Sequence, residues 1–431
     1  MFDKDLLIEA INTHLNDDVP RLETLYGYYK GTHSILDRED RPNKPNNKLV
    51  CCHPSKIVDT STAYFIGQPV VILDDDLDVQ NELIYILKDN YFDDLLLEIS
   101  KESSIRGKSG MLVYQDEEGK TGLMKVDATE LVQVFDTKAK KDITARVYTF
   151  TDDSDEEHYA VEVYDNEKVE YFLYEDDMLI PDTRYENTEV NHIFGFCPLI
   201  IFKNNEELQG DFEKVMTLID AYDKLMSDTS NEHEAYRNAY LMLKNLLMSP
   251  EAEQKLQQGG TISVGDDGDA KFITKTIQDS AITAHLKKLQ EDIHNFTDIP
   301  NLSDENFAGN SSGVSLRYKL LGLENKSIIK ESKFRRALMQ MCKCLSSVIN
   351  IKIKKQVDIA KLKIQFTRNI PQDLQDIADL IVKLEGIVDK ETLLTLLPFV
   401  ENPQVILDKL AEDDFNTSED FKDAIGTDVN E

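Results

Sequence analysis

This sequence of 431 residues lacks any long run of apolar residues. The runs it has, such as residues 396–400, are far shorter than the ~20 residues that a helix needs to cross a bilayer. Its first residues, Met1-Phe2-Asp3-Lys4-Asp5, also lack the charged-then-apolar plan of a secretory signal. We therefore expect no membrane-spanning segment and an origin in the cytoplasm.

Cysteine is scarce as well. The chain holds five, an odd number for its length, which makes a disulfide framework a poor interpretation. Cys51-Cys52-His53 is the one place that suggests a metal, but neighbouring cysteines point apart on a strand. No second Cys/His cluster stands at zinc spacing. We predict free thiols, no bound metal and no cofactor. The cysteines are Cys51, Cys52, Cys197, Cys342 and Cys344.

Positive charge is in short supply, with 48 Lys and Arg against 81 Asp and Glu and a formal net charge of −33. Tight wrapping of nucleic acid depends on many basic residues, so this composition excludes it. The charge is uneven. Residues 151–190 hold 15 acidic and 2 basic residues, and the tail 411–431 holds 8 acidic residues and one lysine. Residues 271–355, by contrast, hold 15 basic and 8 acidic residues, a basic block inside a very acidic chain.

Catalytic patterns are also missing. Gly107-Lys108-Ser109 matches the end of a phosphate-binding P-loop, but that motif needs a glycine where residue 102 is Glu. A helix is expected before the tripeptide and a strand after it, the reverse of the order that holds phosphate. His233 lacks a second histidine at helical spacing, and no Gly-x-Ser-x-Gly elbow occurs. We predict that the protein is not an enzyme.

Hydrophobic periodicity predicts an α+β fold that is mainly helical. In the first half, residues 3–30 read as helix broken at Pro20, residues 54–65 as helix and residues 70–73 as strand. A single amphipathic helix is expected over residues 81–103. From residue 111 to residue 199, short alternating stretches separated by acidic turns predict a meander or small sandwich of strands.

The second half returns to helical spacing. A helix is expected from residue 211 to about 246, although residues 239–243 fit a strand equally well. Within residues 250–276 a short helix and two strands, 261–264 and 271–276, would form a compact insert before a helix at 279–296. A polar loop, 298–313, precedes a long helix to about residue 351 with a kink at Gly322. A strand at 362–366, helices at 374–384, 390–399 and 404–410, and a frayed acidic tail complete the prediction.

Several short blocks, in order along the chain, resemble the portal proteins of siphophages and related prophages of Gram-positive bacteria. Each block is modest alone, and together they span almost the whole sequence. They are Tyr28-Tyr29-Lys30-Gly31, Ile35-Leu36-Asp37-Arg38, Asn47-Lys48-Leu49-Val50, Ile57-Val58-Asp59-Thr60, Tyr64-Phe65-Ile66-Gly67-Gln68-Pro69, Asp304-Glu305-Asn306-Phe307-Ala308-Gly309-Asn310-Ser311-Ser312-Gly313-Val314 and Phe366-Thr367-Arg368-Asn369-Ile370-Pro371.

The resemblance implies a ring of about twelve subunits around a channel for double-stranded DNA. The wing would be residues 1–209 and 312–370, the stem helices 210–236 and 278–297, the clip 237–277 and the crown 371–431. Residues 298–311 would be a tunnel loop lining the channel. Its implied channel residues are Asn301, Asp304, Glu305, Asn306, Phe307 and Asn310.

The resemblance also implies partners and a place. The clip would dock the terminase large subunit during packaging and the head-completion adaptor afterwards. Major capsid and scaffolding proteins would surround the ring at one vertex of the virion, after assembly in the bacterial cytoplasm. The ring would serve genome packaging, head–tail joining and DNA ejection.

Charge fits a conduit, because acidic walls repel phosphate while a few rings of lysine steer it. The candidates for such rings are Lys271, Lys275, Lys287 and Lys288, which could equally pair with acids of the next subunit. Lys333, Arg335 and Arg336 are expected to make contacts between subunits. Two other interpretations stay open: an interaction scaffold of the cytoplasm that need not close into a ring, and a nucleotide-binding enzyme acting through Gly107-Lys108-Ser109.

Overall fold

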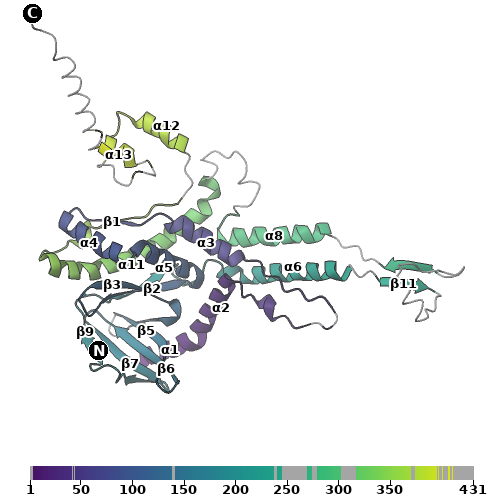
Figure 1. Ribbon diagram of the computed structural model, residues 1–431, viewed down its shortest axis with the longest axis horizontal. Helices are drawn as coiled ribbons and strands as arrows, with labels where there is room; N and C mark the ends of the chain where they lie inside the picture. Colours follow the sequence, from purple (N-terminus) through teal and green to yellow (C-terminus); the bar gives the residue numbers. More distant parts are fainter. Residues whose placement is uncertain are drawn as a thin grey trace, which may run out of the picture. The chain divides into compact units, whose positions relative to one another are not determined.

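The computed structural model describes residues 3–40, 44–137, 141–236, 240–244, 269–273, 279–301, 317–369 and 374–395, with a few isolated positions besides. Contacts divide the chain into two units, Met1–Asn369 and Ile370–Glu431. Helices and strands alternate along the first unit, which confirms a mixed α+β fold (Figure 1). In the part of the chain that is described, no helix is long and apolar enough to cross a membrane. The predictions for residues 250–264 and 411–431 lie outside it.

The N-terminal helical segment does not break at Pro20. Helix α1 (Lys4–Thr13) passes through a π-helical turn (His14–Asp18) directly into α2 (Val19–Lys30). Pro20 stands in the first turn of α2, where a missing N–H costs little. The buried His14 ring bonds the carbonyl oxygen of Thr129 through Nε2 at 2.7 Å, and this contact fixes the π turn against the sheet region. The prediction of a break at Pro20 was therefore wrong.

Residues 81–103 form parts of two helices rather than one. After α3 (His53–Ile66) and the short strand β1 (Val71–Leu73), α4 (Leu77–Asp89) ends at Asn90 and α5 (Phe92–Arg106) begins two residues later. The Asn90 amide donates to the carbonyl of Thr121 at 3.0 Å and accepts from the N–H of Leu123 at 2.7 Å. Tyr91 adopts a left-handed φ of 49° and is exposed. The hydrogen bonds of Asn90 to β3 (Thr121–Val126) thus end α4, and the chain turns before α5 begins.

Two antiparallel sheets follow α5, as the alternation from residue 111 onwards predicts. The smaller has the order β10 (Leu199–Lys203), β2 (Lys108–Gln115), β3 (Thr121–Val126). The larger runs from β4 (Leu131–Asp136) through β5 (Lys141–Thr151) and β6 (Glu157–Tyr164) to β7 (Lys168–Glu175). Both β8 (Met178–Pro181) and β9 (Glu189–Asn191) pair with β7. Helix α1 packs on the larger sheet through Leu7 and Ile11, both fully buried.

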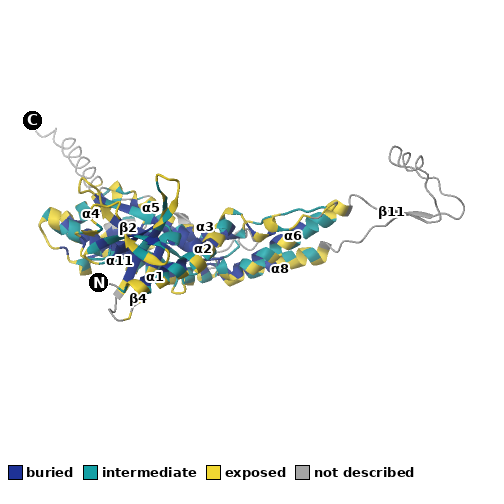
Figure 2. Ribbon diagram, turned by 90° about the horizontal axis from the view of Figure 1, so that it is seen from below, coloured by how far each residue is buried: buried dark blue, intermediate teal, exposed yellow. Residues whose placement is uncertain are grey.

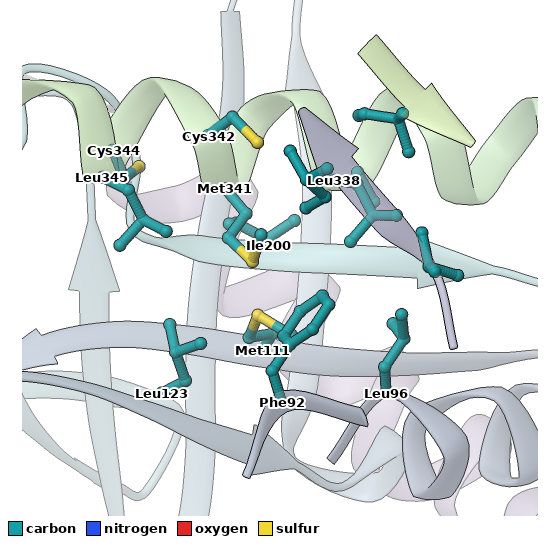
Figure 3. Packing of buried hydrophobic residues seen from close by; sticks show 14 of the residues in the cluster. Phe92, Leu96, Met111, Leu123, Ile200, Leu338, Met341, Cys342, Cys344 and Leu345 are labelled. Carbon is teal, nitrogen blue, oxygen red and sulfur yellow. The ribbon is translucent and has the colours of Figure 1, made fainter. Parts of the chain in front are cut away.

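The main core forms where the long helix α11 (Leu321–Ile353) lies across the smaller sheet and helices α3, α4 and α5. Figure 3 shows Leu338, Met341 and Leu345 of α11 facing Ile200 of β10 and Met111 of β2. Residues 317–319 are also helical, and a turn at Leu320 separates them from α11, two residues before Gly322, where a kink was expected. Burying such side chains stabilises the fold by roughly 1.5–3 kcal/mol each, which makes this cluster the centre of the first unit.

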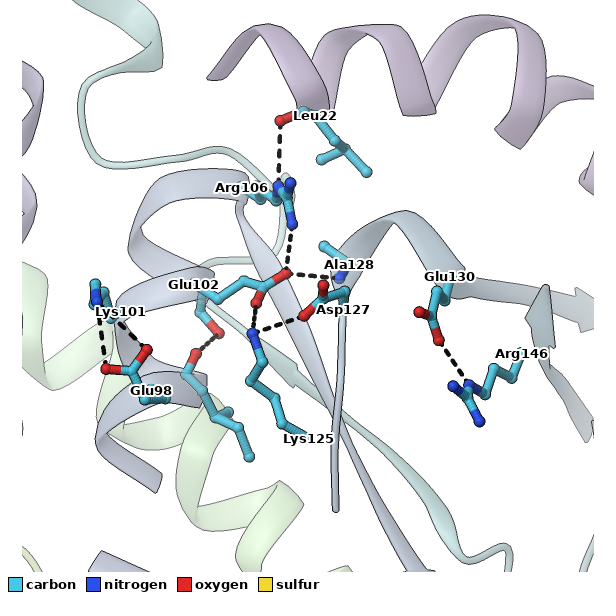
Figure 4. Close-up of polar contacts among 12 residues, drawn as sticks. Leu22, Glu98, Lys101, Glu102, Arg106, Lys125, Asp127, Ala128, Glu130 and Arg146 are labelled. Atoms are coloured by element: carbon cyan, nitrogen blue, oxygen red, sulfur yellow. Dashed lines mark hydrogen bonds and ion pairs between the residues drawn. The ribbon is translucent and has the colours of Figure 1, made fainter. Parts of the chain in front are cut away.

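A buried carboxylate connects the helical layer to the sheets (Figure 4). Glu102 of α5 accepts from Arg106 at 2.9 Å and from the N–H of Ala128 at 2.8 Å, and it also pairs with Lys125 of β3. Arg106 in turn donates to the carbonyl of Leu22 in α2. A buried charge is tolerated only when it is paired and fully bonded, and Glu102 meets that condition. The network fixes α2, α5 and β3 relative to one another.

Candidate functional site: a helix pair and its anchors

Helices α6 (Met216–Tyr236) and α8 (Asp279–Thr297) pack side by side and antiparallel, and both have largely exposed or half-exposed surfaces away from the main core (Figures 1 and 2). Leu289 and Ile293 of α8 are buried as the periodicity predicts. Helical spacing from these residues also predicts that Phe296 is buried, but it is 63% exposed, and Thr297 is the residue that turns inward there.

The segment between the two helices contains a β-hairpin-like pair. Strand β11 (Tyr240–Lys244) pairs antiparallel with β12 (Asp269–Ile273), with Leu241 opposite Phe272. The strand interpretation of residues 239–243 is confirmed, and the long-helix alternative is wrong because α6 ends at Tyr236. The expected pairing partner of 271–276, residues 261–264, lies outside the described residues.

A polar strap runs along α6, made of residues 28–38 and 47–51. Its residues bond side chains that recur every three or four positions on one face of the helix. Tyr28 Oη donates to Asp220 at 2.7 Å, Ser227 Oγ accepts from the N–H of Leu49 at 2.9 Å, and Asn231 Oδ1 accepts from the N–H of Asn47 at 2.6 Å. Three of the blocks that carry the family resemblance fall in this strap, which gives those residues a common structural role.

The centre of the strap is a fully buried pair, His33 and Asp223. His33 Nδ1 lies 2.5 Å from one carboxylate oxygen of Asp223, and the other oxygen accepts from the N–H of Cys51 at 2.8 Å. The second ring nitrogen of His33 bonds the Tyr28 carbonyl at 3.0 Å. Burial, and then the Asp223 charge, raise the pKa of the Cys51 thiol to about 12, so this cysteine stays a protonated, unreactive thiol.

Two lysines of α11 hold the base of the helix pair. Lys326 forms an ion pair with Asp211 at 3.0 Å, just before α6, and donates to the carbonyl of Thr297 at the end of α8, at 3.2 Å. Lys330 donates to Ser100 and Ser104 of α5. Burial alone would raise the pKa of Asp211, but the two lysines outweigh it and hold that pKa at about 2. Burial lowers the pKa of Lys330 to about 8.

At the same base, α8 ends in a histidine cluster. His294 Nδ1 donates to the carbonyl of Ile299 at 2.9 Å, and its ring meets that of His53 at 6.1 Å between centroids. His53 also packs edge-on against Tyr222 of α6. Burial lowers the pKa of His53 to about 4 and lowers that of His294. Lys56 of α3 donates to the Asn301 side chain at 3.0 Å. The segment that follows α8 is therefore fixed to α3 as far as residue 301.

Two further resemblance blocks, 300 residues apart in the chain, lie against each other. Phe366 stacks on Phe65 at 5.5 Å, and the N–H of Asn369 donates to the Tyr64 carbonyl at 3.1 Å. Arg368 pairs with Glu324 and Glu331 of α11, and Tyr64 Oη donates to Glu324 at 2.7 Å. Strand β13 (Lys363–Gln365) pairs with β1 just before this contact.

The predicted channel and contact residues fall in different places. Lys287 and Lys288 are exposed on α8, where Lys288 pairs with Asp292 of its own helix at 2.6 Å. Lys333 pairs with Glu206, and Arg335 with Glu331 at 2.7 Å, both within the chain, while Arg336 is exposed. Asn301 is anchored by Lys56. Lys271 lies in β12, whereas Lys275, Asp304, Glu305, Asn306, Phe307 and Asn310 lie outside the described residues.

The tripeptide Gly107-Lys108-Ser109 is a helix-to-strand turn. Gly107 ends α5 with a φ of 86°, and a Cβ there would meet the Leu208 carbonyl oxygen at 2.0 Å. Lys108 begins β2 and donates to the Leu131 carbonyl at 2.9 Å, while Ser109 is fully buried. No helix N-terminus follows to hold phosphate, so the tripeptide lacks the geometry of a nucleotide site.

Cys51, Cys52 and His53 do not converge on a common point in the part of the chain described. His53 points to Tyr222 and His294, and Cys52 is exposed. Within the described ranges, metal-ligating side chains gather in one place, Asp152, Glu156 and His158 on the exposed turn from β5 to β6.

Sequence reasoning missed the residues that bear the helix pair. Beside the apolar stripe of α6, a neighbouring face carries Asp220, Asp223, Ser227 and Asn231 at helical spacing. That polar periodicity is the signal that could have revealed the strap. The pairing of His33 with Asp223, 190 positions apart, carries no local signal.

The described part of the first unit is thus a mixed α+β body from which an antiparallel helix pair extends, bonded along one face by the polar strap. The family model described as phage portal protein, SPP1 Gp6-like, matches residues 8–420. The portal protein of Bacillus phage SPP1 is 27% identical over 386 residues, 86% of this chain and 76% of its own length. The portal protein of Clostridium phage phiCD119 is 24% identical over 431 aligned positions, 92% of this chain and 93% of its own length. The chain belongs to the SPP1 Gp6-like family of phage portal proteins.

Proposed function

We propose that this chain is the repeating subunit of a portal ring of about twelve copies, set at one vertex of a phage capsid, through which double-stranded DNA enters and leaves. The observation that carries the proposal is the match of residues 8–420 to the portal family. The helix pair anchored by the strap and by Lys326 supports it, because a conduit wall needs helices held rigidly at their base.

In this proposal α6 and α8 are the stem, β11 and β12 belong to the clip, and residues 298–311 form the tunnel loop. The body built on α11 and the two sheets is the wing, and the helices after residue 370 are the crown. The clip docks the terminase large subunit and then the head-completion adaptor. Capsid and scaffolding proteins contact the wing. The ring has no catalytic step of its own.

Charge supports a conduit that does not retain its cargo. The net charge of −33 per copy repels phosphate, and exposed lysines on α8 such as Lys287 provide a few attractive points. Binding of DNA to isolated rings should therefore be weak and strongly salt-dependent.

The test is electron microscopy of the purified protein with native mass spectrometry to count subunits. Closed rings of about a dozen copies with a central hole are the expected result. A protein that stays monomeric or dimeric across salt and concentration, alone and with scaffolding protein, would contradict the ring.

A further inference from the structure

The ring of His53, in the first turn of α3, lies against both helices of the pair. Its centroid is 4.8 Å from that of Tyr222 of α6 and 6.1 Å from that of His294 of α8. In the same turn of α3, Lys56 donates to the Asn301 side chain at 3.0 Å. The first turn of α3 therefore contacts α6, α8 and the segment that follows α8 at once.

The His294 ring is bonded as a neutral imidazole. A carbonyl oxygen can only accept, so Nδ1 donates to the Ile299 carbonyl and the lone pair of the neutral ring lies on Nε2. Nε2 is buried and has no hydrogen-bond partner among the residues described. A proton there would form an N–H group for which those residues offer no acceptor, and an unpaired buried donor costs free energy. The closed arrangement therefore favours the neutral ring.

His53 is held neutral as well. Burial is the largest of the effects that lower its pKa to about 4, and the nearby His294, Lys56 and His33 lower that pKa further. Asp223 raises the pKa, but this carboxylate already accepts from a backbone N–H and bonds the His33 ring. The ring also lies at the N-terminus of α3, where the helix dipole disfavours a cation.

We propose that His53 and His294 form a latch that opens in acid: when the two rings bind protons, the first turn of α3 separates from the helix pair and releases residues 299–301. Opening exposes both rings to water, which solvates a protonated imidazole and separates it from the charge of Lys56. The latch belongs to one copy, so the inference does not rest on the proposed ring. Within that ring, opening would add residues 299–301 to the part of the tunnel loop that is free to move.

Opening remains local because the second attachment of the helix pair survives acid. Lys326 pairs with Asp211 at 3.0 Å and donates to the Thr297 carbonyl at 3.2 Å. Burial would raise the pKa of Asp211, but Lys326 and Lys330 hold it at about 2, so the ion pair persists while the histidines titrate. The base of the helix pair therefore stays fixed to α11 when α3 releases it.

The open form binds more protons than the closed form. In the closed form the pKa of His53 is about 4, and in the open form it lies near the ordinary value of about 6.5. The open form therefore gains population as pH falls and loses it as pH rises. Between these two pKa values, each fall of one pH unit favours the open form about tenfold for each proton taken up.

Tryptophan fluorescence tests the latch, because the chain contains no tryptophan of its own. Tyr222→Trp places one indole against His53, at a half-buried position. Lowering the pH should shift the emission to the red as the indole meets water, with a midpoint between about pH 6.5 and about pH 4. The helical circular dichroism signal of the same samples should stay unchanged over that range.

Substitutions identify the titrating ring. In the Tyr222→Trp background, His53→Gln should abolish the shift, and His285→Gln, at an exposed position of α8, should leave it unchanged. A shift that persists in His53→Gln, or one that coincides with loss of the circular dichroism signal, would overturn the proposal. Emission that does not change down to about pH 4 would overturn it too.

Hydrogen exchange gives a second measurement that needs no tryptophan. Corrected for the intrinsic effect of pH, the protection of residues 293–301 should fall by about tenfold for each pH unit below about pH 6, whereas residues 334–345 of α11 should keep theirs. His53→Lys, which carries a permanent charge, should show the low protection of residues 293–301 already at neutral pH. Protection that is unchanged in acid and in His53→Lys would mean that the first turn of α3 stays in place when charged, and the latch would be wrong.

Discussion

At the level of single residues, the buried Asp223 is the side chain of α6 that we expect to contribute most to stability. It is fully buried, bonds His33 at 2.5 Å and accepts the N–H of Cys51 at 2.8 Å. Asp223→Ala should lower the free energy of unfolding by about 3 kcal/mol, because it leaves a buried imidazole and a backbone donor unpaired. The measurement is urea unfolding followed by circular dichroism.

The same helix offers a matched control. Glu234 also bonds the strap, through the side chain of Asn47 at 3.0 Å, but it is exposed. Glu234→Ala should cost less than about 1 kcal/mol. Equal losses for the two variants would show that burial of the His33–Asp223 pair is not what makes it stabilising.

His53 should make stability depend on pH. Burial lowers its pKa to about 4 in the folded protein, against about 6.5 in the unfolded chain. As pH falls through that window, the unfolded chain binds a proton that the folded chain does not, so the fold loses stability. His53→Gln should remove roughly 1–2 kcal/mol of the loss between pH 7 and pH 5, given that the ring is partly accessible.

His285→Gln, at an exposed position of α8, is the comparison for that experiment. Urea midpoints at pH 7 and pH 5 for the wild type and both variants give the answer. A His53→Gln protein with the full wild-type pH dependence would place the titrating group elsewhere.

Among the helices, substitution of two glycines by alanine should change the stability of the protein in opposite directions. Gly67 ends α3 where a Cβ would meet the Ala63 carbonyl oxygen at 2.2 Å and the Asn369 amide at 2.7 Å. Gly67→Ala should therefore destabilise the protein by about 2 kcal/mol and loosen the contact with residues 366–369. Gly27 lies inside α2 with nothing closer than 3.6 Å, so Gly27→Ala should stabilise by about 0.5–1 kcal/mol. Thermal unfolding of both variants distinguishes them.

Helices and strands with strong periodicity were predictable, and their ends were not. Strands β4 to β7, α8 and α12 follow from alternation or helical spacing, whereas the short strands β8 and β9 were not predicted. The break at Asn90 did not, because its side-chain amide donates to the Thr121 carbonyl and accepts from the Leu123 N–H, on a strand that comes later in the chain. The predicted break at Pro20 failed for a related reason. The helix continues there through a π turn, which is fixed by a hydrogen bond to the distant Thr129.

For the molecule as a whole, the loop after α8 is the part to remove. The deletion should begin at residue 302, because Ile299 and Asn301 are held by His294 and Lys56 and belong to the anchored base. Deleting residues 302–310 should spare ring assembly, seen by electron microscopy, and abolish packaging of DNA into proheads with terminase. Normal packaging by the deleted chain would remove the tunnel-loop assignment.

The function came from the sequence through resemblance blocks rather than through chemistry, and the structure explains why those blocks exist. Most of them lie in the strap or in the contact between residues 64–67 and 366–369, where they hold elements together. The pairings across 190 to 300 positions that make up the site could not be derived from local patterns, since spacing along the chain says nothing about them.

Lys326 joins Asp211, where the chain leaves the body, to Thr297, where it returns. Everything between these residues is, in topological terms, an insertion whose two ends are fixed at one point. Changes of length or sequence beyond the strapped part of α6 therefore leave the separation of those ends unaltered. Such an arrangement lets the distal segment differ in length or sequence without disturbing the packing of the body.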